Sequence, residues 1–177
     1  MVAKTDTGRL LVGLLRAVNV GGTGPLPMRD LVRICESAAF TGVRTYIQSG
    51  NVVFRTRLSP EKAAQALARA LLDETGSAID VLVRTPADLD RIVRDNPFLG
   101  ADGARVVVLF CSEKVPKAAL KGVSGPAGEE VVADEREIYI HYPEGQGRSK
   151  LKLPRLPGFQ TARNINTVTK LAEMCRE

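Results

Sequence analysis

The chain has 177 residues, which is enough for one large core or for two small modules that share one. An apolar fraction of 44% and a charged fraction of 25% are typical of a folded protein and exclude an intrinsically disordered chain. Aromatic residues make up only 5%, so the core is expected to be mostly aliphatic. The formal net charge of +5 is compatible with anionic partners but does not require them.

The cysteine pattern and the hydropathy indicate a cytoplasmic protein with no membrane partner. Three scattered cysteines form no C-x-x-C pair, and an odd count argues against a disulfide framework. Reduced thiols are therefore predicted, and no zinc spacing is present. The apolar run from Leu10 to Leu15 is far too short to span a bilayer, so a strand is expected there.

Hydrophobic periodicity predicts six elements in the first half of the chain. They are a buried strand over Arg9–Val18, a helix over Met28–Phe40, strands over Val43–Gln48 and Asn51–Thr56 joined by a two-residue turn at Ser49-Gly50, a helix that follows Ser59-Pro60 and stops near Gly76, and a strand over Ile79–Arg84. Ser before Pro is a strong helix start, and Gly accepts the positive φ of a hairpin turn. The βαββαβ order predicts a ferredoxin-like module over residues 9–84, after a disordered tail over residues 1–8.

The second half is expected to repeat this order incompletely. The predicted elements are a helix from Pro86 to about Asp95, a strand over Ala104–Cys111, a short helix over Lys117–Lys121, a hairpin of Glu129–Asp134 with Glu137–Tyr142, a loop over Pro143–Gly158, and a final helix over Thr167–Arg176 capped by Asn166. The order βαββα predicts a second, related or degenerate α+β module over residues 101–177, packed on the first and without its last strand. Residues 85–100 would form the connecting helix.

Three polar segments interrupt these elements where a strand ends or a helix begins: residues 15–22, 45–54 and 161–168. Each carries amide, hydroxyl or guanidinium groups, which a folded domain displays at element ends to avoid burying them without partners. The three segments are therefore candidates for one binding site. Whether the chain is an enzyme stays open at this point.

The loop from Asn19 to Pro27 precedes a helix N-terminus, where free N–H groups and the helix dipole attract anions. Its glycine spacing lacks the third glycine of a dinucleotide fingerprint, and no P-loop occurs. Pro25 and Pro27 also remove two N–H donors. A tight structural turn is therefore favoured over a phosphate cradle.

The other two segments offer side-chain donors. Tyr46 and Gln48 share one face of a predicted strand, where they would either present a hydroxyl beside an amide or bond to a neighbouring loop. Arg163 offers a planar bidentate donor suited to a carboxylate or a phosphate. Because a cation near a helix N-terminus opposes the dipole, an anionic ligand is favoured there over an internal acidic partner.

Four stretches of the sequence resemble the DUF1697 family of uncharacterised bacterial proteins: residues 14–22, 27–31, 45–54 and 161–171. The resemblance covers nearly the whole chain. It implies a two-part α+β fold of ferredoxin-like character and brings no reaction or cofactor. Ala17 stands where related chains usually have Gly, and Ile165 where they usually have Trp. The loop over residues 22–27 also lacks a basic residue often found there, which implies different or weaker binding if these groups contact a ligand.

Catalytic patterns in the sequence are weak. His141 is the only histidine, and it alternates with Glu137 and Tyr139 on one face of a strand, for which an exposed position is predicted. No nucleophile motif accompanies a Ser or Cys, so catalytic residues are unknown. RNA-recognition modules share the βαββαβ order, but the aromatic platform on which they stack bases is missing.

The leading hypothesis is a polar cleft between the two modules that binds a small anionic or phosphate-bearing ligand. The expected ligand-binding residues, with no metal among the ligands, are Arg16, Asn19, Gly21, Gly22, Tyr46, Gln48, Ser49, Asn51, Arg163, Asn164, Asn166 and Thr167. The alternative is a nucleic-acid or protein interaction module that uses the stretch from Arg148 to Lys170, which has six basic residues and no acidic one. In a third reading, the polar motifs only hold the two halves together.

Overall fold

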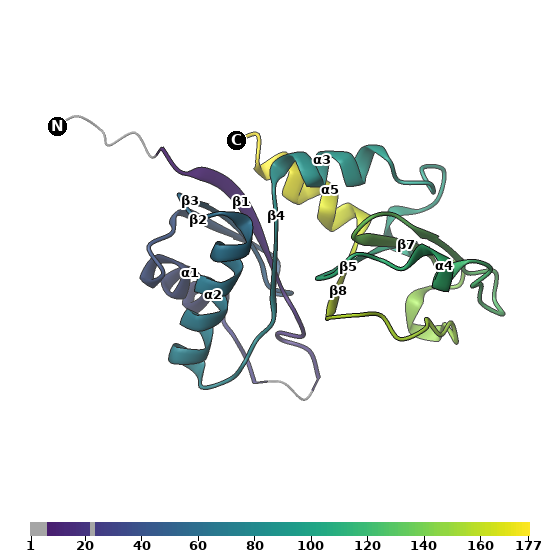
Figure 1. Cartoon of the computed structure of the whole chain (residues 1–177), viewed down its shortest axis with the longest axis horizontal. Coiled ribbons are helices and arrows are strands. Elements are labelled where there is room, and N and C mark those ends of the chain that lie inside the picture. The colour runs from purple at the N-terminus through teal and green to yellow at the C-terminus, as the bar shows by residue number, and fades with distance from the viewer. Residues whose placement is uncertain (1–6, 22–23) are drawn as a thin grey trace. The chain divides into compact units, whose positions relative to one another are not determined.

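The computed structural model describes residues 7–21 and 24–177. The chain divides into two compact units, Met1–Leu89 with Leu171–Glu177, and Asp90–Lys170. Each unit contains a four-stranded antiparallel sheet, and the described residues form five α-helices (Figure 1). The predicted α+β class is confirmed at this level. Residues 1–6 of the predicted tail and the candidate site residue Gly22 lie outside the described residues.

The first unit has the six elements that the sequence predicts. They are β1 (Arg9–Leu15), α1 (Met28–Ser37), β2 (Thr41–Tyr46), β3 (Asn51–Thr56), α2 (Pro60–Thr75) and β4 (Val81–Arg84), followed by the beginning of α3 (Pro86–Arg94). The sheet order is β2-β3-β1-β4, and all neighbouring strands are antiparallel. Strand β1 therefore lies inside the sheet, and its last residues are fixed from both sides.

The core of the first unit lies between one face of the sheet and the two helices α1 and α2, which lie side by side in Figure 1. Leu67 and Leu71 of α2 recur at helical spacing and are fully buried. The rings of Phe40 and Phe54 stack at 4.2 Å. The predicted helix limits are confirmed, because the Ser59 side chain accepts the N–H of Lys62 and a left-handed Gly76 follows the last turn.

The last residues of the chain belong to the first unit. Arg44 on the edge strand β2 donates to the main-chain carbonyl of Met174 at 2.7 Å. It also pairs with the carboxylate of Glu177 at 2.8 Å. These contacts attach the C-terminal residues to the sheet that begins at Arg9.

The second unit repeats the sheet order of the first. Its elements are the rest of α3, the 3-10 turn η1 (Gly103–Arg105), β5 (Val106–Cys111), α4 (Lys117–Leu120), β6 (Glu130–Ala133), β7 (Glu137–His141), η2 (Gln146–Arg148), β8 (Gln160–Asn164) and α5 (Ile165–Met174). The order is β6-β7-β5-β8, with β5 in the place that β1 holds in the first unit. Leu171 and the residues after it belong to the first unit.

The predicted βαββα order is wrong at its end. The last strand is present as β8, which pairs with β5 from Val107–Asn164 to Cys111–Gln160. The missing element is the helix between the third and fourth strands, because residues 149–159 form neither helix nor strand. Strand β8 escapes sequence prediction because its residues, Gln-Thr-Ala-Arg-Asn, have no hydrophobic alternation.

Two local predictions also need correction. The hairpin connection has four residues, because β2 ends at Tyr46 and Ile47 takes a left-handed φ of 48°. Helix α5 begins at Ile165, and its cap is Asn164 rather than Asn166. The side-chain oxygen of Asn164 accepts the N–H of Thr167 at 2.9 Å, which is the third helical position.

The face of β7 that was expected to be exposed is buried. Glu137 is 0% exposed and pairs with Arg91, and Tyr139 is 2% exposed. The Tyr139 hydroxyl donates to the carbonyl of Ile92 at 2.9 Å. The part of α3 that belongs to the second unit therefore covers this face, and only His141 at the strand end remains half-buried.

Gly50 tests the packing of the hairpin turn. It has a φ of 81°, and an added Cβ would lie 2.5 Å from Cγ2 of Val18 and 2.8 Å from Cβ of Leu15. Gly50→Ala is expected to lower the free energy of unfolding by about 2–4 kcal/mol, through backbone strain and overpacking. Gly122→Ala is the matched control, because Gly122 has a φ of 78° and open space around it, so only about 1 kcal/mol is expected. Equal losses in urea unfolding would contradict this packing.

Candidate functional site

The first two polar segments meet at one end of the sheet of the first unit. The N–H of Leu15 donates to the carbonyl of Gly50 at 2.9 Å. The Asn19 side chain donates to the carbonyl of Gln48 at 2.8 Å. The turn after β1 and the turn between β2 and β3 are therefore bonded to each other.

Asn19 shapes the loop that leads into α1. Its amide nitrogen also donates to the carbonyl of Leu26 at 2.8 Å, and its amide oxygen accepts the N–H of Leu26 at 2.7 Å. Asn19 has a φ of 54°, which asparagine tolerates better than most residues. Because both amide N–H groups are bonded to the main chain, Asn19 is a positioning residue for this loop.

Asn51 has the same role in the hairpin. It is fully buried and donates to the carbonyl of Tyr46 at 3.0 Å and to the hydroxyl of Ser49 at 2.9 Å. Tyr46 is half-buried, while Gln48 and Gly21 are exposed. The Asn51 side chain thus forms hydrogen bonds within the turn between β2 and β3.

A cavity of about 580 Å³ lies beside the loop that Asn19 shapes. Its volume falls within the range of small-molecule sites, roughly 300–1,000 Å³. The apolar wall comes from Ala17, Val18, Pro25, Leu26, Ala78 and Ile79, with Gly24 at the same wall. The polar groups come from Arg16, Thr75, Ser77 and Asp80.

Arg16 and Asp80 form an ion pair in the wall of this cavity. The guanidinium nitrogen lies 3.1 Å from the carboxylate oxygen, and each side chain is 49% exposed. The main-chain N–H of Arg16 also donates to the carbonyl of Asp80 at 3.0 Å. An ion pair this exposed contributes only about 0–1 kcal/mol, so separating Arg16 from Asp80 would cost little free energy.

Arg16 is among the candidate residues expected from the sequence, and Asp80 is not. The signal for Asp80 is the strand pairing, because Leu15 pairs with Val81 and the next residue outward on each strand is Arg16 or Asp80. That inference requires the sheet order as well as the strands. Thr75 is the last residue of α2 and Ser77 follows its C-cap glycine, and neither carries a motif.

The third polar segment forms the junction of β8 and α5 in the second unit. Arg163 is 7% exposed and donates to the Thr161 hydroxyl and the Ala162 carbonyl, both at 2.8 Å. Burial lowers the pKa of Arg163 to about 10, which still leaves it charged at neutral pH. Asn164 caps α5, and the exposed Asn166 packs against Gly103, where its amide oxygen would lie 2.1 Å from an added Cβ.

The Cys35 thiol is fully buried. Burial raises the pKa of Cys35 to about 12, so this thiol stays protonated and is a poor nucleophile at neutral pH. Residues 7–21 and 24–177 contain no group of three or more His, Cys, Asp or Glu side chains placed to hold a metal ion. In the same residues, no helix has both the length and the apolar character that a bilayer span requires.

A family model described as a protein of unknown function (DUF1697) matches residues 10–139. The chain belongs to the DUF1697 family. The matched region of this DUF1697 protein includes Arg16, Asn19 and Asp80, and it ends before Arg163. No curated protein matches the chain.

The structure of this DUF1697 protein is similar to the solved structure of the conserved bacterial protein SP0830 from Streptococcus pneumoniae. The sequences are 20% identical, and the TM-score is 0.74. The similarity covers 94% of this chain and 98% of that chain. At this identity the comparison shows a shared fold.

The backbone of Ala17 takes a conformation that suits glycine better than alanine. Ala17 has a φ of 54°, in the left-handed region that favours glycine. An alanine there costs about 1 kcal/mol relative to glycine. This DUF1697 protein therefore carries backbone strain beside Arg16, in the wall of the cavity.

Arg163 is expected to act on stability. Arg163→Ala removes two buried hydrogen bonds and the packing of the side chain, so a loss of about 2–4 kcal/mol is expected. For a chain of this size, that corresponds to a fall in melting temperature of about 5–15 °C. The control Arg155→Ala changes an exposed arginine of the same unit and should alter stability by less than about 0.5 kcal/mol. A melting curve for Arg163→Ala that matches this control would contradict a structural role.

Proposed function

We propose that the first unit binds a small molecule with an anionic group, a carboxylate or a phosphate, in the cavity beside Arg16. The observation that supports this most is a half-exposed guanidinium in the wall of a 580 Å³ cavity. A guanidinium presents planar donors that match carboxylate and phosphate oxygens. Every residue named for the proposed site belongs to the first unit. The proposal concerns binding and includes no reaction.

Asp80 narrows the class of ligand. Its carboxylate lies 3.1 Å from Arg16, so a plain anion at Arg16 would meet a like charge. A hydroxyl or amine on the same ligand removes this conflict by donating to Asp80. Ser77 in the wall adds a further polar partner, whereas the Thr75 hydroxyl already donates to the carbonyl of Leu71 at 2.7 Å. Hydroxy acids, amino acids and sugar phosphates have this combination of groups.

Asn19 has an indirect part in the proposed site. Its amide fixes Leu26, which lies in the apolar wall of the cavity. The loop is thereby held before a ligand arrives, which reduces the entropy cost of binding. Of the residues predicted from sequence, Arg16 would contact the ligand and Asn19 would position the wall.

We also infer that both units are ferredoxin-like modules and that the second is degenerate. The order β2-β3-β1-β4 with antiparallel neighbours is the one that a split βαβ arrangement produces. The second unit has the equivalent order β6-β7-β5-β8. An irregular segment replaces the helix between its third and fourth strands. The helix between its first two strands, α4, has 4 residues, whereas α1 has 10.

The proposal is tested by thermal-shift screening against hydroxy acids, amino acids, sugar phosphates and inorganic phosphate, followed by calorimetry on the best compound. Arg16→Gln should raise its dissociation constant about 10–100-fold, because a charge-assisted hydrogen bond is worth about 1.5–3 kcal/mol. Asp80→Asn should tighten the binding of inorganic phosphate about 2–5-fold, because the competing carboxylate is removed. The same variant should weaken the binding of a ligand that donates a hydrogen bond to Asp80.

Arg29→Gln is the matched control for this experiment. Arg29 is on α1, its side chain is 88% exposed, and it does not line the cavity. The Arg29→Gln substitution removes the same charge as Arg16→Gln and should leave the dissociation constant unchanged. Equal effects of Arg16→Gln and Arg29→Gln, or no stabilising compound in the panel, would exclude the proposed site.

A further inference from the structure

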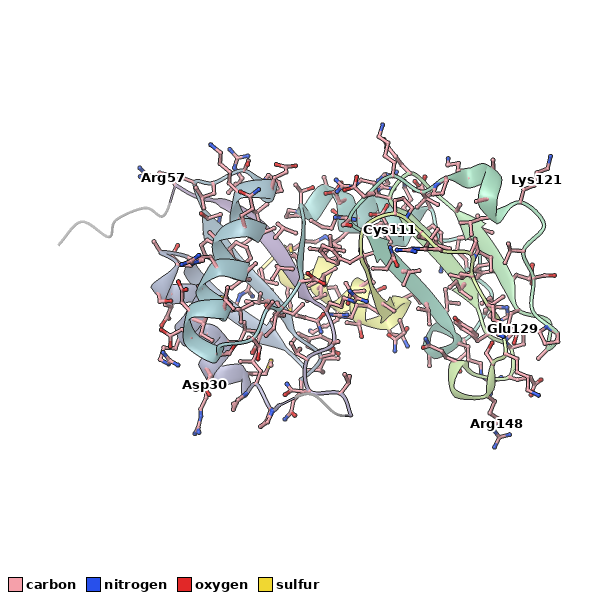
Figure 2. All side chains as sticks on the ribbon, turned by 60° about the horizontal axis from the view of Figure 1, so that its bottom comes forward. Asp30, Arg57, Cys111, Lys121, Glu129 and Arg148 are labelled. Carbon is pink, nitrogen blue, oxygen red and sulfur yellow. The ribbon has the colours of Figure 1, made fainter. Side chains whose placement is uncertain are left out.

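A row of exposed cations follows the connection between β7 and β8 in the second unit. We call residues 148–155 the basic segment. Its charged members are Arg148, Lys150, Lys152 and Arg155, all of them exposed. In the part of the chain that the structure describes, none of the four has an acidic partner within 4.0 Å. Figure 2 shows the Arg148 side chain pointing away from the ribbon.

Leucines alternate with these cations and turn them outward. Leu151, Leu153 and Leu156 are partly buried and pack against the aliphatic cluster on one face of the second sheet, which includes Ile138 and Ile140. Because the leucines point inward, the lysines and the arginine between them point to solvent. The packing of the segment therefore fixes the direction of its charges.

Hydrogen bonds hold the segment at both ends. The Ser149 hydroxyl donates to the buried carboxylate of Glu129 at 2.8 Å, and that carboxylate also accepts the N–H of Ala127 at 2.9 Å. These bonds lower the pKa of Glu129, so it stays charged at neutral pH. At the far end, Ser112 and Phe159 exchange two hydrogen bonds of 2.9 Å. The row of cations is therefore held in place before any partner arrives.

The first unit fills the same connection differently. Its third and fourth strands are joined by α2, whose outer face carries charges of both signs, as in the i,i+4 pair of Arg69 with Asp73. The basic segment has no such compensation, and its like charges repel one another. Among residues 7–21 and 24–177, none of these four cations forms an ion pair, so their charges are available to an anionic partner.

We propose that the basic segment binds single-stranded nucleic acid through its phosphates. Lys150 and Lys152 are two residues apart, about 6–7 Å in extended chain, which suits contacts to successive phosphates of one strand. The segment contains none of the exposed large hydrophobic residues of the described chain, and protein interfaces depend on such anchors and are depleted in lysine. Apart from the 3-10 turn η2, which ends at Arg148, the segment is irregular and offers no α-helix or two-stranded ribbon to enter a duplex groove.

The mode of contact sets the expected strength. Without exposed aromatic rings for stacking, binding is electrostatic and independent of base sequence. Four phosphate contacts to a single strand give a slope of log affinity against log salt of about −2.8. Affinity should therefore fall about 50-fold between 50 and 200 mM salt.

Fluorescence anisotropy with labelled 20-nucleotide oligo(dT) and oligo(U) tests the proposal. The triple variant Lys150→Ala, Lys152→Ala, Arg155→Ala should reduce the slope by about 2.1, to about −0.7. Its control is Arg9→Ala, Arg57→Ala, Lys62→Ala, which removes the same charge from exposed positions of the first unit. The control should retain the full slope and bind DNA and RNA alike.

Three results would overturn the proposal. The first is no binding by the wild-type chain at 50 mM salt, and the second is an equal loss of slope in the two triple variants. The third is binding of poly-glutamate as tight as that of the oligonucleotides, which would assign the segment to an acidic protein. If the triple variant unfolds, the single variant Lys152→Ala is used instead. Loss of one phosphate contact should reduce the slope of log affinity against log salt by about 0.7.

Discussion

The end of the first unit that carries the cavity depends on one side chain, Asn19. Its amide bonds to the main chain of Leu26 on one side and of Gln48 on the other, so two loops far apart in sequence share one anchor. Asparagine suits this position because it accepts a left-handed backbone while offering a donor and an acceptor. With the loop fixed, Arg16 is presented at the end of β1 beside a formed wall. The wall beside that guanidinium is thus held by hydrogen bonds that no ligand supplies.

The two units have the same sheet order but connect their third and fourth strands in different ways. In the first, a 16-residue helix joins the third and fourth strands and covers the core with alanine and leucine. In the second, an irregular segment inserts three leucines for the same purpose. An extended chain alternates sides at every residue, whereas a helix spreads its polar residues over a broad face. The irregular connection therefore concentrates charge in a narrow line, and the helix disperses it.

Local signals predicted much of the fold. The limits of α2 are set by local chemistry: Ser59 caps its start, Pro60 is its first residue and the left-handed Gly76 ends it. These limits can be predicted without knowledge of tertiary contacts. Strand β8 is polar and is recognisable only through its pairing with β5. The same limit applies to the site, because a polar residue in sequence does not reveal its partner. Asn51 and Asn164 looked like ligand contacts, yet they bond to the main chain or to a neighbouring side chain, while Asp80 depends on the pairing of β1 with β4.

The return of the chain to its first unit has a consequence for biosynthesis. Residues 171–177 belong with residues 1–89, and Arg44 on β2 donates a hydrogen bond to the carbonyl of Met174. Domains usually fold in the order in which the ribosome releases them. Here the whole second unit emerges before the first receives its final contacts. The sheet that is translated first therefore lacks the contacts of Arg44 with Met174 and Glu177 until translation reaches the last residues.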